Sequence, residues 1–467
     1  MNTAKTKITD AQQAANDLYS FISENEQNII DGSVVSFVLP VNKINLIAKL
    51  SVINDIYDEF FFFEKFDEGY SIAVLNCLIE LSSNKKDILS LENDISKLKS
   101  QLVSNWSDYN INNIPIVSGG IKFDSEKSSS EWDNFRAIHF FVPQIIILQK
   151  EDETYLIYNF LANSKINNEN IVINFTQSVS AIFNLDDEGT VKKNIAYESN
   201  SEINNNKSLW NSIVTEAKKK LNRDLKKIVL SRKIEFLVKD DIDWTQMFRE
   251  LETSFSNCYL FMLKSNKAVF FGASPEKFLS VRDNKIEIDA LAGSAPRNST
   301  DVESELLNKK NIKEHRYVID FISQAMSEYA HDIRVDTCPQ IKKLKNVQHL
   351  YTKINAKLNE DRNVLSLIDS MFPTPAVCGL PKQIAHETIN EIEKFDRGLF
   401  SGLIGWIDIN FNCEFAVAIR SALYKKGELH LYAGAGIVEE SVPEEEYIET
   451  EMKFNTILSL FHEQNKG

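Results

Sequence analysis

The chain has 467 residues, of which 43% are hydrophobic and 25% are charged, so it contains enough apolar sequence for a substantial core. Its formal net charge of −15 argues against a nucleic-acid partner or an anionic membrane surface, because both are polyanions. Any anionic substrate must therefore meet a local cluster of positive charge. The five cysteines show no Cys-x-x-Cys spacing, so neither a zinc site nor a disulfide framework is indicated.

The first residues lack the apolar core of a signal peptide, and no run of about 18 apolar residues occurs anywhere. We therefore expect a cytoplasmic protein without a membrane-spanning segment. Residues 1–205 alternate short apolar stretches with polar helical ones, which predicts mixed sheet and helix. The run Phe60–Phe63 is far too short to span a membrane and predicts a core strand. Lys86–Leu102 has the pattern of an amphipathic, solvated helix.

The Asn- and Ser-rich segment Glu198–Ser208 is the best linker in the chain, because it has too little apolar sequence to order itself. We therefore divide the chain into an N-terminal α/β segment, residues 1–205, and a catalytic region, residues 206–467. Helical periodicity follows in Trp210–Leu221, and a β-branched strand in Lys226–Leu237.

The rest of the chain predicts alternating strands and helices. The strands are expected at Ala268–Phe271, Lys285–Ala290, Phe415–Ser421 and Glu428–Ala433, and the helices at Ile312–Tyr329, Glu387–Glu393 and Glu444–His462. No repeat of 20–50 residues is visible, which argues against a solenoid or propeller.

The C-terminal stretch Leu431–Val438 contains Gly434 and Gly436 and runs into an acidic helix. A glycine-rich turn there would let backbone amides approach an anion closely. Glu449 and Lys453 stand four residues apart, so they share one helical face and can present a metal ligand beside a positive charge.

Six residues form a candidate site if the fold brings them together: Lys227, Glu276, Glu314, Arg420, Glu449 and Lys453. A lysine and a glutamate could then act as base and acid, provided that burial and neighbouring charges shift their pKa values. Two further glutamates suit Mg²⁺, which takes carboxylate oxygens and keeps several waters. Taken singly, each of these residues also fits a solvated strand end, a charge at a helix terminus or a surface position.

Nine segments in order resemble the chorismate-utilising enzyme family, and its isochorismate synthase branch in particular. They span roughly residues 207–460 and are Lys227–Arg232, Phe271–Glu276, Ala290–Arg297, Glu314–His315, Gln348–His349, Phe372–Pro381, Arg397–Trp406, Phe415–Ser421 and Gly434–Lys453. The resemblance implies an α/β (α+β) fold in which two antiparallel sheets stack and helices flank them.

The same resemblance implies roles for individual residues. Lys227 would be the general base that activates water for attack at ring carbon 2 of chorismate, and Glu276 the general acid that protonates the departing 4-hydroxyl. Glu314 and Glu449 would bind Mg²⁺, and Arg420 would pair with a substrate carboxylate. The remaining substrate-binding positions would be Gly293, Ser294, His349, Ala376, Gly434, Gly436 and Lys453.

Two other functions stay open. Salicylate synthases share the lysine and go on to eliminate pyruvate, and a non-catalytic chorismate-binding protein would keep the pocket without turnover. Lys227 favours water over ammonia as nucleophile, so no glutaminase subunit is expected and the chain is predicted to be a monomer. The product would feed menaquinone or siderophore biosynthesis. Cys378, where relatives more often have glycine, and Asn311, where some have an acid, depart from the family pattern.

Overall fold

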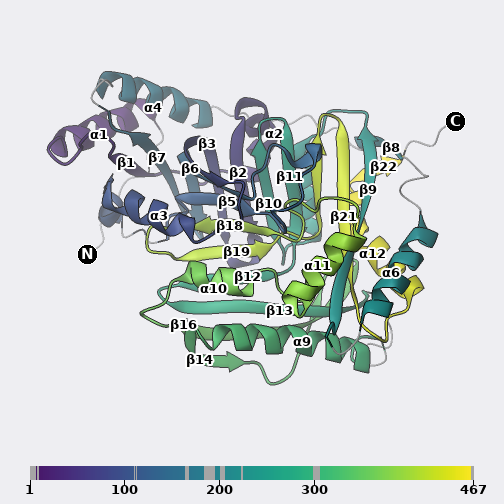
Figure 1. The fold of residues 1–467 in the computed structure, drawn as a ribbon. Coiled ribbons are helices and arrows are strands. Elements are labelled where there is room, and N and C mark those ends of the chain that lie inside the picture. Colours follow the sequence, from purple (N-terminus) through teal and green to yellow (C-terminus); the bar gives the residue numbers. More distant parts are fainter. Residues whose placement is uncertain are drawn as a thin grey trace.

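The computed structural model describes residue 7 and residues 10–109, 111, 113–163, 168–183, 195–199, 206–221, 224–297 and 305–463. Strands of this part of the chain are linked by hydrogen bonds into one large, mostly antiparallel sheet, and helices cover its outer faces (Figure 1). This confirms the predicted mixed α/β fold with antiparallel sheet and flanking helices. None of the described helices is both long and apolar enough to cross a membrane.

The longer helices are α1 (Ala11–Glu24), α2 (Leu46–Ile56), α3 (Ser90–Ser100), α4 (Asn168–Phe183), α6 (Lys207–Lys220), α7 (Trp244–Ser254), α9 (Lys309–Met326), α10 (Val364–Met371), α11 (Lys382–Ile392) and α12 (Pro443–Leu458). The strands of the first 200 residues are β1 (Val34–Pro40), β2 (Glu59–Lys65), β3 (Tyr70–Ser83), β4 (Leu102–Ser104), β5 (Val117–Ile121), β6 (Ile138–Lys150), β7 (Glu153–Leu161) and β8 (Ile195–Ser199).

The later strands are β9 (Lys227–Val238), β10 (Tyr259–Ser265), β11 (Ala268–Ser274), β12 (Lys277–Arg282), β13 (Lys285–Pro296), β14 (Ala330–Val335), β15 (Gln340–Lys343), β16 (Val347–Leu358), β17 (Gly379–Leu380), β18 (Leu403–Ile407), β19 (Cys413–Val417), β20 (Ser421–Lys425), β21 (Glu428–Ile437) and β22 (Phe461–Glu463). The N-terminal strands join this set directly, since β2 pairs with β10 and β5 pairs with β18.

The phenylalanine run lies in β2, as predicted, and is fully buried. Successive side chains of a strand point to opposite faces, so the run supplies two cores. Phe61 and Phe63 belong to the larger core, which also contains residues of the later strands, while Phe60 and Phe62 pack under the helices on the other face.

Three arrangements position the functional residues. Helix α9 packs against β13, α12 against β21, and α11 against β9. Strands β9 and β21 run antiparallel over their whole length, so Gly434 stands opposite Ser231 and Gly436 opposite Val229 (Figure 1). Strands β13 and β16 form a second long pair, which has a bulge between Ala292 and Ser294.

Several predicted boundaries were wrong. The stretch Gly434–Gly436 is not a turn but the end of strand β21, because its backbone pairs with β9. The last helix ends at Leu458, and Phe461–Glu463 is a strand rather than more helix. The predicted strand Phe415–Ser421 is split into β19 and β20, and Arg420 lies between them with a φ of 54°.

The predicted linker lies partly outside the described residues. Within Glu198–Ser208, two residues belong to strand β8 and two to helix α6, whose N-cap is Asn206. The five cysteines are all free thiols.

Arg397 is a structural ion-pair residue. It forms a buried pair with Glu393, with 2.6 Å between Arg397 Nη2 and Glu393 Oε1. The guanidinium also donates to the carbonyl oxygens of Val377 and Val229 at 2.9 and 2.8 Å, and so ties the segment before β17 to β9.

Candidate active site

Lys227 is the first residue of β9, and its side chain is completely buried. Its ammonium Nζ lies 2.9 Å from Glu314 Oε1, a carboxylate that projects from helix α9. The two groups form an ion pair, although their angle is not that of a hydrogen bond. A buried lysine without a hydrogen-bond partner among the described residues is costly for a fold, which makes this position a candidate for function.

Gly436 on β21 explains how α9 comes so close to the lysine. A β-carbon at this position would lie 2.2 Å from Glu314 Oε1 and 3.1 Å from Lys227 Cε. An added methyl group would therefore displace the Glu314 carboxylate from Lys227, so the glycine matters for close approach rather than for an unusual backbone angle.

Glu276 follows strand β11 and is 4% exposed. Burial and, after it, the nearby charge of Asp289 raise the pKa of its carboxyl group to about 8, against the opposing charges of Lys227, Lys342 and Arg420. The group is therefore protonated at neutral pH. It can give a proton to a leaving group, which is the property that a general acid needs.

Arg420 and His349 form a second buried pair, although 71 positions separate them in the sequence. The imidazole Nδ1 lies 3.2 Å from the carbonyl oxygen of Gly293, which can only accept, so Nδ1 carries the hydrogen. Nε2 then accepts from Arg420 Nη2 at 2.9 Å. Burial and the adjacent guanidinium hold the pKa of His349 well below its usual range, so the ring is neutral.

The Arg420 guanidinium is thus buried against a neutral partner. No ion pair joins it to a carboxylate within the part of the chain that the structure describes. Burial lowers its pKa to about 10, a direction opposed by the more distant charges of Glu449 and Glu276. A cation held in this way favours an anionic ligand, because the ligand restores the lost solvation.

Glu449 and Lys453 face each other on α12, with 2.5 Å between Glu449 Oε1 and Lys453 Nζ. Burial alone would raise the pKa of Glu449, but Lys453 and a hydrogen bond from Ser294 outweigh it and lower the pKa to about 2. Lys453 also donates to the carbonyl oxygen of Gly434 at 2.7 Å. The carboxylate is therefore ionised at every physiological pH.

These contacts link the candidate residues into a closed circuit, which we call the ring. Ser294 Oγ lies 3.1 Å from His349 Nδ1 and also reaches Glu449, so it links the arginine pair to α12. Lys453 contacts Gly434 on β21, and Gly436 on the same strand lies against the pair of Lys227 and Glu314, which completes the circuit. The structure thus brings together the predicted residues Lys227, Glu276, Gly293, Ser294, Glu314, His349, Arg420, Gly434, Gly436, Glu449 and Lys453.

Ala376 is the one predicted residue without a contact of its own to this ring. Its backbone N–H bonds to Thr374 Oγ1 at 3.3 Å, and it lies just before β17, which pairs with β9 beside Lys227. The segment is therefore adjacent to the site, and the predicted substrate contact of Ala376 stays a prediction.

Two further acidic residues belong to the site. Glu446, one helical turn before Glu449, is fully buried, pairs with Lys310 and leaves its Oε2 without a partner among the described residues. Burial and the charge of Glu449 raise its pKa to about 7. Asp289 accepts from Tyr351 Oη at 3.1 Å and acts on Glu276. The i, i+3 spacing of Glu446 and Glu449 could have revealed the first of these from sequence.

The donor set fits a hard divalent cation. Carboxylates are the ligands that Mg²⁺ prefers, and Glu446 Oε2 is a buried oxygen with unused acceptor capacity. The glutamates do not form a compact triad, since among described residues only Glu131, Glu235 and His430 bring three such ligand atoms within 4.8 Å. One or two carboxylates with water and substrate oxygens is the usual arrangement for Mg²⁺.

Replacing Gly436 with alanine is expected to destabilise the fold, because the added carbon must push Glu314 away from Lys227. Over-packing of this kind costs about 1–3 kcal/mol, which denaturant unfolding would measure. Gly434→Ala is the comparison, since its β-carbon would lie 3.0 Å from Ser231 Oγ and 3.1 Å from the carbonyl oxygen of Leu230, and contacts of this length need shifts of only a few tenths of an ångström, so a smaller loss is expected. Equal stability of Gly436→Ala and wild type would contradict the geometry.

Comparisons with known proteins identify the family of the chain. The family model for chorismate binding enzymes matches residues 20–462. The chain is 32% identical to the isochorismate synthase MenF of Bacillus subtilis over 74% of both chains, and 32% identical to that of Haemophilus influenzae over 75% of this chain and 78% of that one. The solved structure of the menaquinone-specific isochorismate synthase MenF from Escherichia coli superposes with a TM-score of 0.77 at 21% identity, covering 97% of this chain and all of that chain. The chain therefore belongs to the family of chorismate-binding enzymes.

Proposed function

We propose that this chain is an isochorismate synthase, which converts chorismate to isochorismate. The observation that carries the proposal is that a buried lysine, a buried guanidinium without a carboxylate partner and a buried carboxyl group that is protonated at neutral pH are close enough for the two cations to act on the pKa of the carboxyl group. Base, acid and anion-binding group therefore stand at one site, as a proton-coupled displacement on an anionic substrate requires.

Lys227 acts from its neutral amine form, so the ammonium that pairs with Glu314 must first give up its proton to solvent. The amine then takes a proton from the water that attacks ring carbon 2 of chorismate, and Glu276 gives its proton to the hydroxyl that leaves carbon 4. One water enters and one leaves, so the reaction is an isomerisation. Arg420, held by His349, binds a substrate carboxylate through its planar fork. His349 stays neutral, and its Nε2 accepts a hydrogen bond from Arg420 Nη2. The imidazole therefore positions the guanidinium and takes no part in proton transfer.

Glu314 and Glu449 would hold Mg²⁺, with Glu446 beside them. The bound ion would supply charge stabilisation of the substrate carboxylate and of the transition state. Lys453 and Lys310 neutralise Glu449 and Glu446 in the described structure, so the ion would take over part of their role when it binds.

The experiment is turnover of chorismate by purified protein in ammonia-free buffer with Mg²⁺, with products separated by chromatography. Isochorismate as the sole product, lost on addition of EDTA and restored by Mg²⁺, is the expected result. Salicylate with pyruvate would instead make the chain a salicylate synthase. Tight chorismate binding without turnover would make it a non-catalytic binding protein.

The arrangement of the chain supports three further proposals. Every residue of the ring lies between positions 227 and 453, so we assign catalysis to residues 206–467 and a scaffold role to residues 1–205. We also propose a monomer without a glutaminase subunit, because water is the nucleophile. The product would enter menaquinone or siderophore biosynthesis, and the extended likeness to a menaquinone-specific enzyme favours the former.

Asp289→Asn is expected to shift the alkaline limb of the pH profile. The charge of Asp289 helps to raise the pKa of Glu276, so its removal lowers that pKa and Glu276 loses its proton at a lower pH. The pH at which half of kcat/KM is lost should fall by up to about one pH unit. Asn can still accept from Tyr351, which keeps the local structure. An unchanged midpoint would show that another group titrates.

A further inference from the structure

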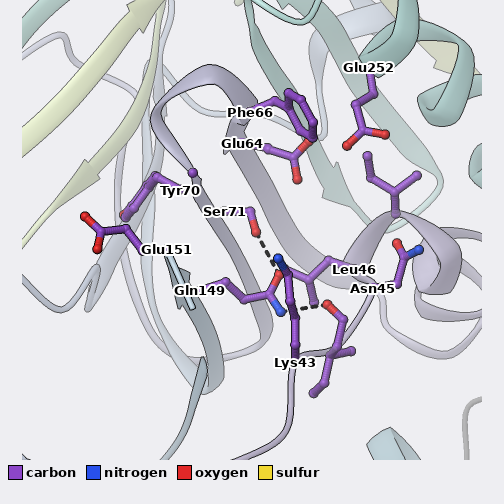
Figure 2. Close-up of a pocket in the computed structure, with 13 residues that line it drawn as sticks. Lys43, Asn45, Leu46, Glu64, Phe66, Tyr70, Ser71, Gln149, Glu151 and Glu252 are labelled. Carbon is purple, nitrogen blue, oxygen red and sulfur yellow. Dashed lines mark hydrogen bonds between the residues drawn. The ribbon is translucent and has the colours of Figure 1, made fainter. Parts of the chain in front are cut away.

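A pocket lies away from the ring of candidate active-site residues and shares no residue with it. Its volume is about 540 Å³, and it opens between the sheet and the helices α2 and α7 (Figure 2). The residues that line it are Lys43, Ile44, Asn45, Leu46, Ile47, Glu64, Phe66, Gly69, Tyr70, Ser71, Gln149, Glu151 and Glu252. Pockets of roughly 300–1,000 Å³ are the size that holds small organic ligands.

The floor of the pocket is a row of polar residues on an otherwise apolar sheet face. Glu64 on β2 stands opposite Ser71 on β3, which in turn stands opposite Gln149 on β6. The neighbouring residue on the same face of β2, Phe62, belongs to the core under the helices. Strand alternation would extend that core, so three polar side chains in register need another explanation.

Two of these three side chains are satisfied within the protein. Ser71 Oγ donates to Gln149 Oε1 at 2.9 Å, and Gln149 Nε2 donates to the carbonyl oxygen of Ile44 at 2.7 Å. Glu64 differs, because it is 8% exposed and its Oε1 has no partner among the residues that the structure describes. Buried carboxyl oxygens are rarely left in this state unless a ligand or solvent completes them.

The charges around Glu64 favour a cation. Three glutamates line the pocket against one lysine. Figure 2 shows the carboxyl groups of Glu64 and Glu252 near one another beside the ring of Phe66, whereas Lys43 lies farther along the pocket. Burial and, after it, the charge of Glu252 raise the pKa of Glu64 to about 8, while the charge of Lys43 opposes the shift. Burial also raises the pKa of Glu252.

We propose that this pocket binds a small organic molecule through a primary ammonium group, which lies between Glu64 and Glu252 while its apolar part contacts Phe66, Leu46 and Ile47. An organic cation fits better than a metal ion, because the lining combines carboxylates with several apolar side chains. The described residues around Glu64 also offer no third carboxylate, histidine or cysteine within metal-ligand distance. This site is independent of the proposed catalysis.

Titration calorimetry with 2-phenylethylammonium at pH 7, in two buffers that differ in ionisation enthalpy, tests the proposal. Glu64 is protonated before binding and must ionise to pair with the ammonium, so about one proton should be released per ligand. The neutral 2-phenylethanol has nearly the same shape and should bind at least about tenfold more weakly, since a buried carboxylate pairs only with the cation. Equal binding of the alcohol, or no heat with millimolar amine, would overturn the proposal.

Variants locate the binding. Glu64→Gln and Glu252→Gln keep the shape of the pocket and should each weaken amine binding by about tenfold or more, and Glu64→Gln should abolish the proton release. Glu250→Gln removes a charge from the exposed face of the same helix and should change nothing. Unchanged amine affinity of Glu64→Gln would refute the site. Proton release on addition of Mg²⁺ in place of the amine would also refute it, because the site would then bind a metal ion.

Discussion

Glu276→Gln is expected to lower kcat for chorismate by about 10²–10⁴, the usual contribution of a general acid. Glutamine has the shape of a protonated glutamate but cannot give up a proton at neutral pH. Because burial holds the pKa of Glu276 at about 8, the wild-type side chain is neutral before reaction, so the substitution changes no charge at pH 7. Chorismate affinity should therefore change little, and the loss should fall on kcat.

The same substitution should increase stability above acidic pH. The pKa of Glu276 is raised on folding from an ordinary value of 4.5 to about 8, so between these values the native state binds more protons than the unfolded state. Stability of the wild type then falls as pH rises through this window. Glutamine removes that dependence, so thermal unfolding should show a higher Tm for the variant, with the difference growing toward pH 8.

Wild-type activity supplies a further check. As pH rises through about 8 the acid loses its proton, and kcat/KM should decline with that midpoint. Glu68→Gln, at an exposed glutamate that pairs with the neighbouring Lys277, is the matched control and should leave activity and profile unchanged. Full activity of Glu276→Gln would remove Glu276 from the mechanism.

Sequence reasoning identified most of the site because the chemistry resides in side chains that motifs preserve. The residues proposed as base, acid and metal ligands were each chosen from their segments, and the structure brings them into one ring, while their roles stay predictions. The sequence did not reveal which side chains of the site contact one another. The contact between Arg420 and His349 joins positions 71 residues apart, and no local pattern encodes such a distance.

The backbone around the site was predicted less well than the side chains, for a physical reason. Glycines favour turns, yet Gly434 and Gly436 lie in a strand because pairing with β9 is a long-range interaction that overrides local preference. Gly436 is needed for the space it leaves to Glu314, not for its flexibility. Arg420 was expected inside a strand, but its left-handed φ of 54° breaks the strand.

Such a conformation costs about 1–3 kcal/mol in a residue other than glycine, and it is typical of functional positions. A strand would have set Arg420 in line with its neighbours, whereas the break allows its guanidinium to reach His349. The local sequence shows neither the cost of this φ value nor the contact that it allows, because its pattern is that of an ordinary apolar strand with one arginine.

Replacement of Lys227 is expected to have an equally large effect, with kcat reduced by about 10²–10⁴ through loss of the base. Alanine would also leave the Glu314 carboxylate without its partner, and breaking a largely buried pair costs about 3–5 kcal/mol. Loss of activity in Lys227→Ala could then reflect loss of fold. Lys227→Gln avoids this, because its amide reaches toward Glu314 but cannot accept a proton from water.

The decisive comparison therefore uses Lys227→Gln beside Lys226→Gln, its exposed neighbour, which removes the same charge outside the site. We expect Lys226→Gln to behave as wild type, and Lys227→Gln to remain folded, to bind chorismate within a few-fold of wild type and to lose turnover. A variant that lost binding and turnover together would make Lys227 a substrate-binding residue. Retained turnover would show that another group is the base. Lys227 is the only buried lysine at the site within the described chain, so the proposed mechanism of water addition would then have no lysine base.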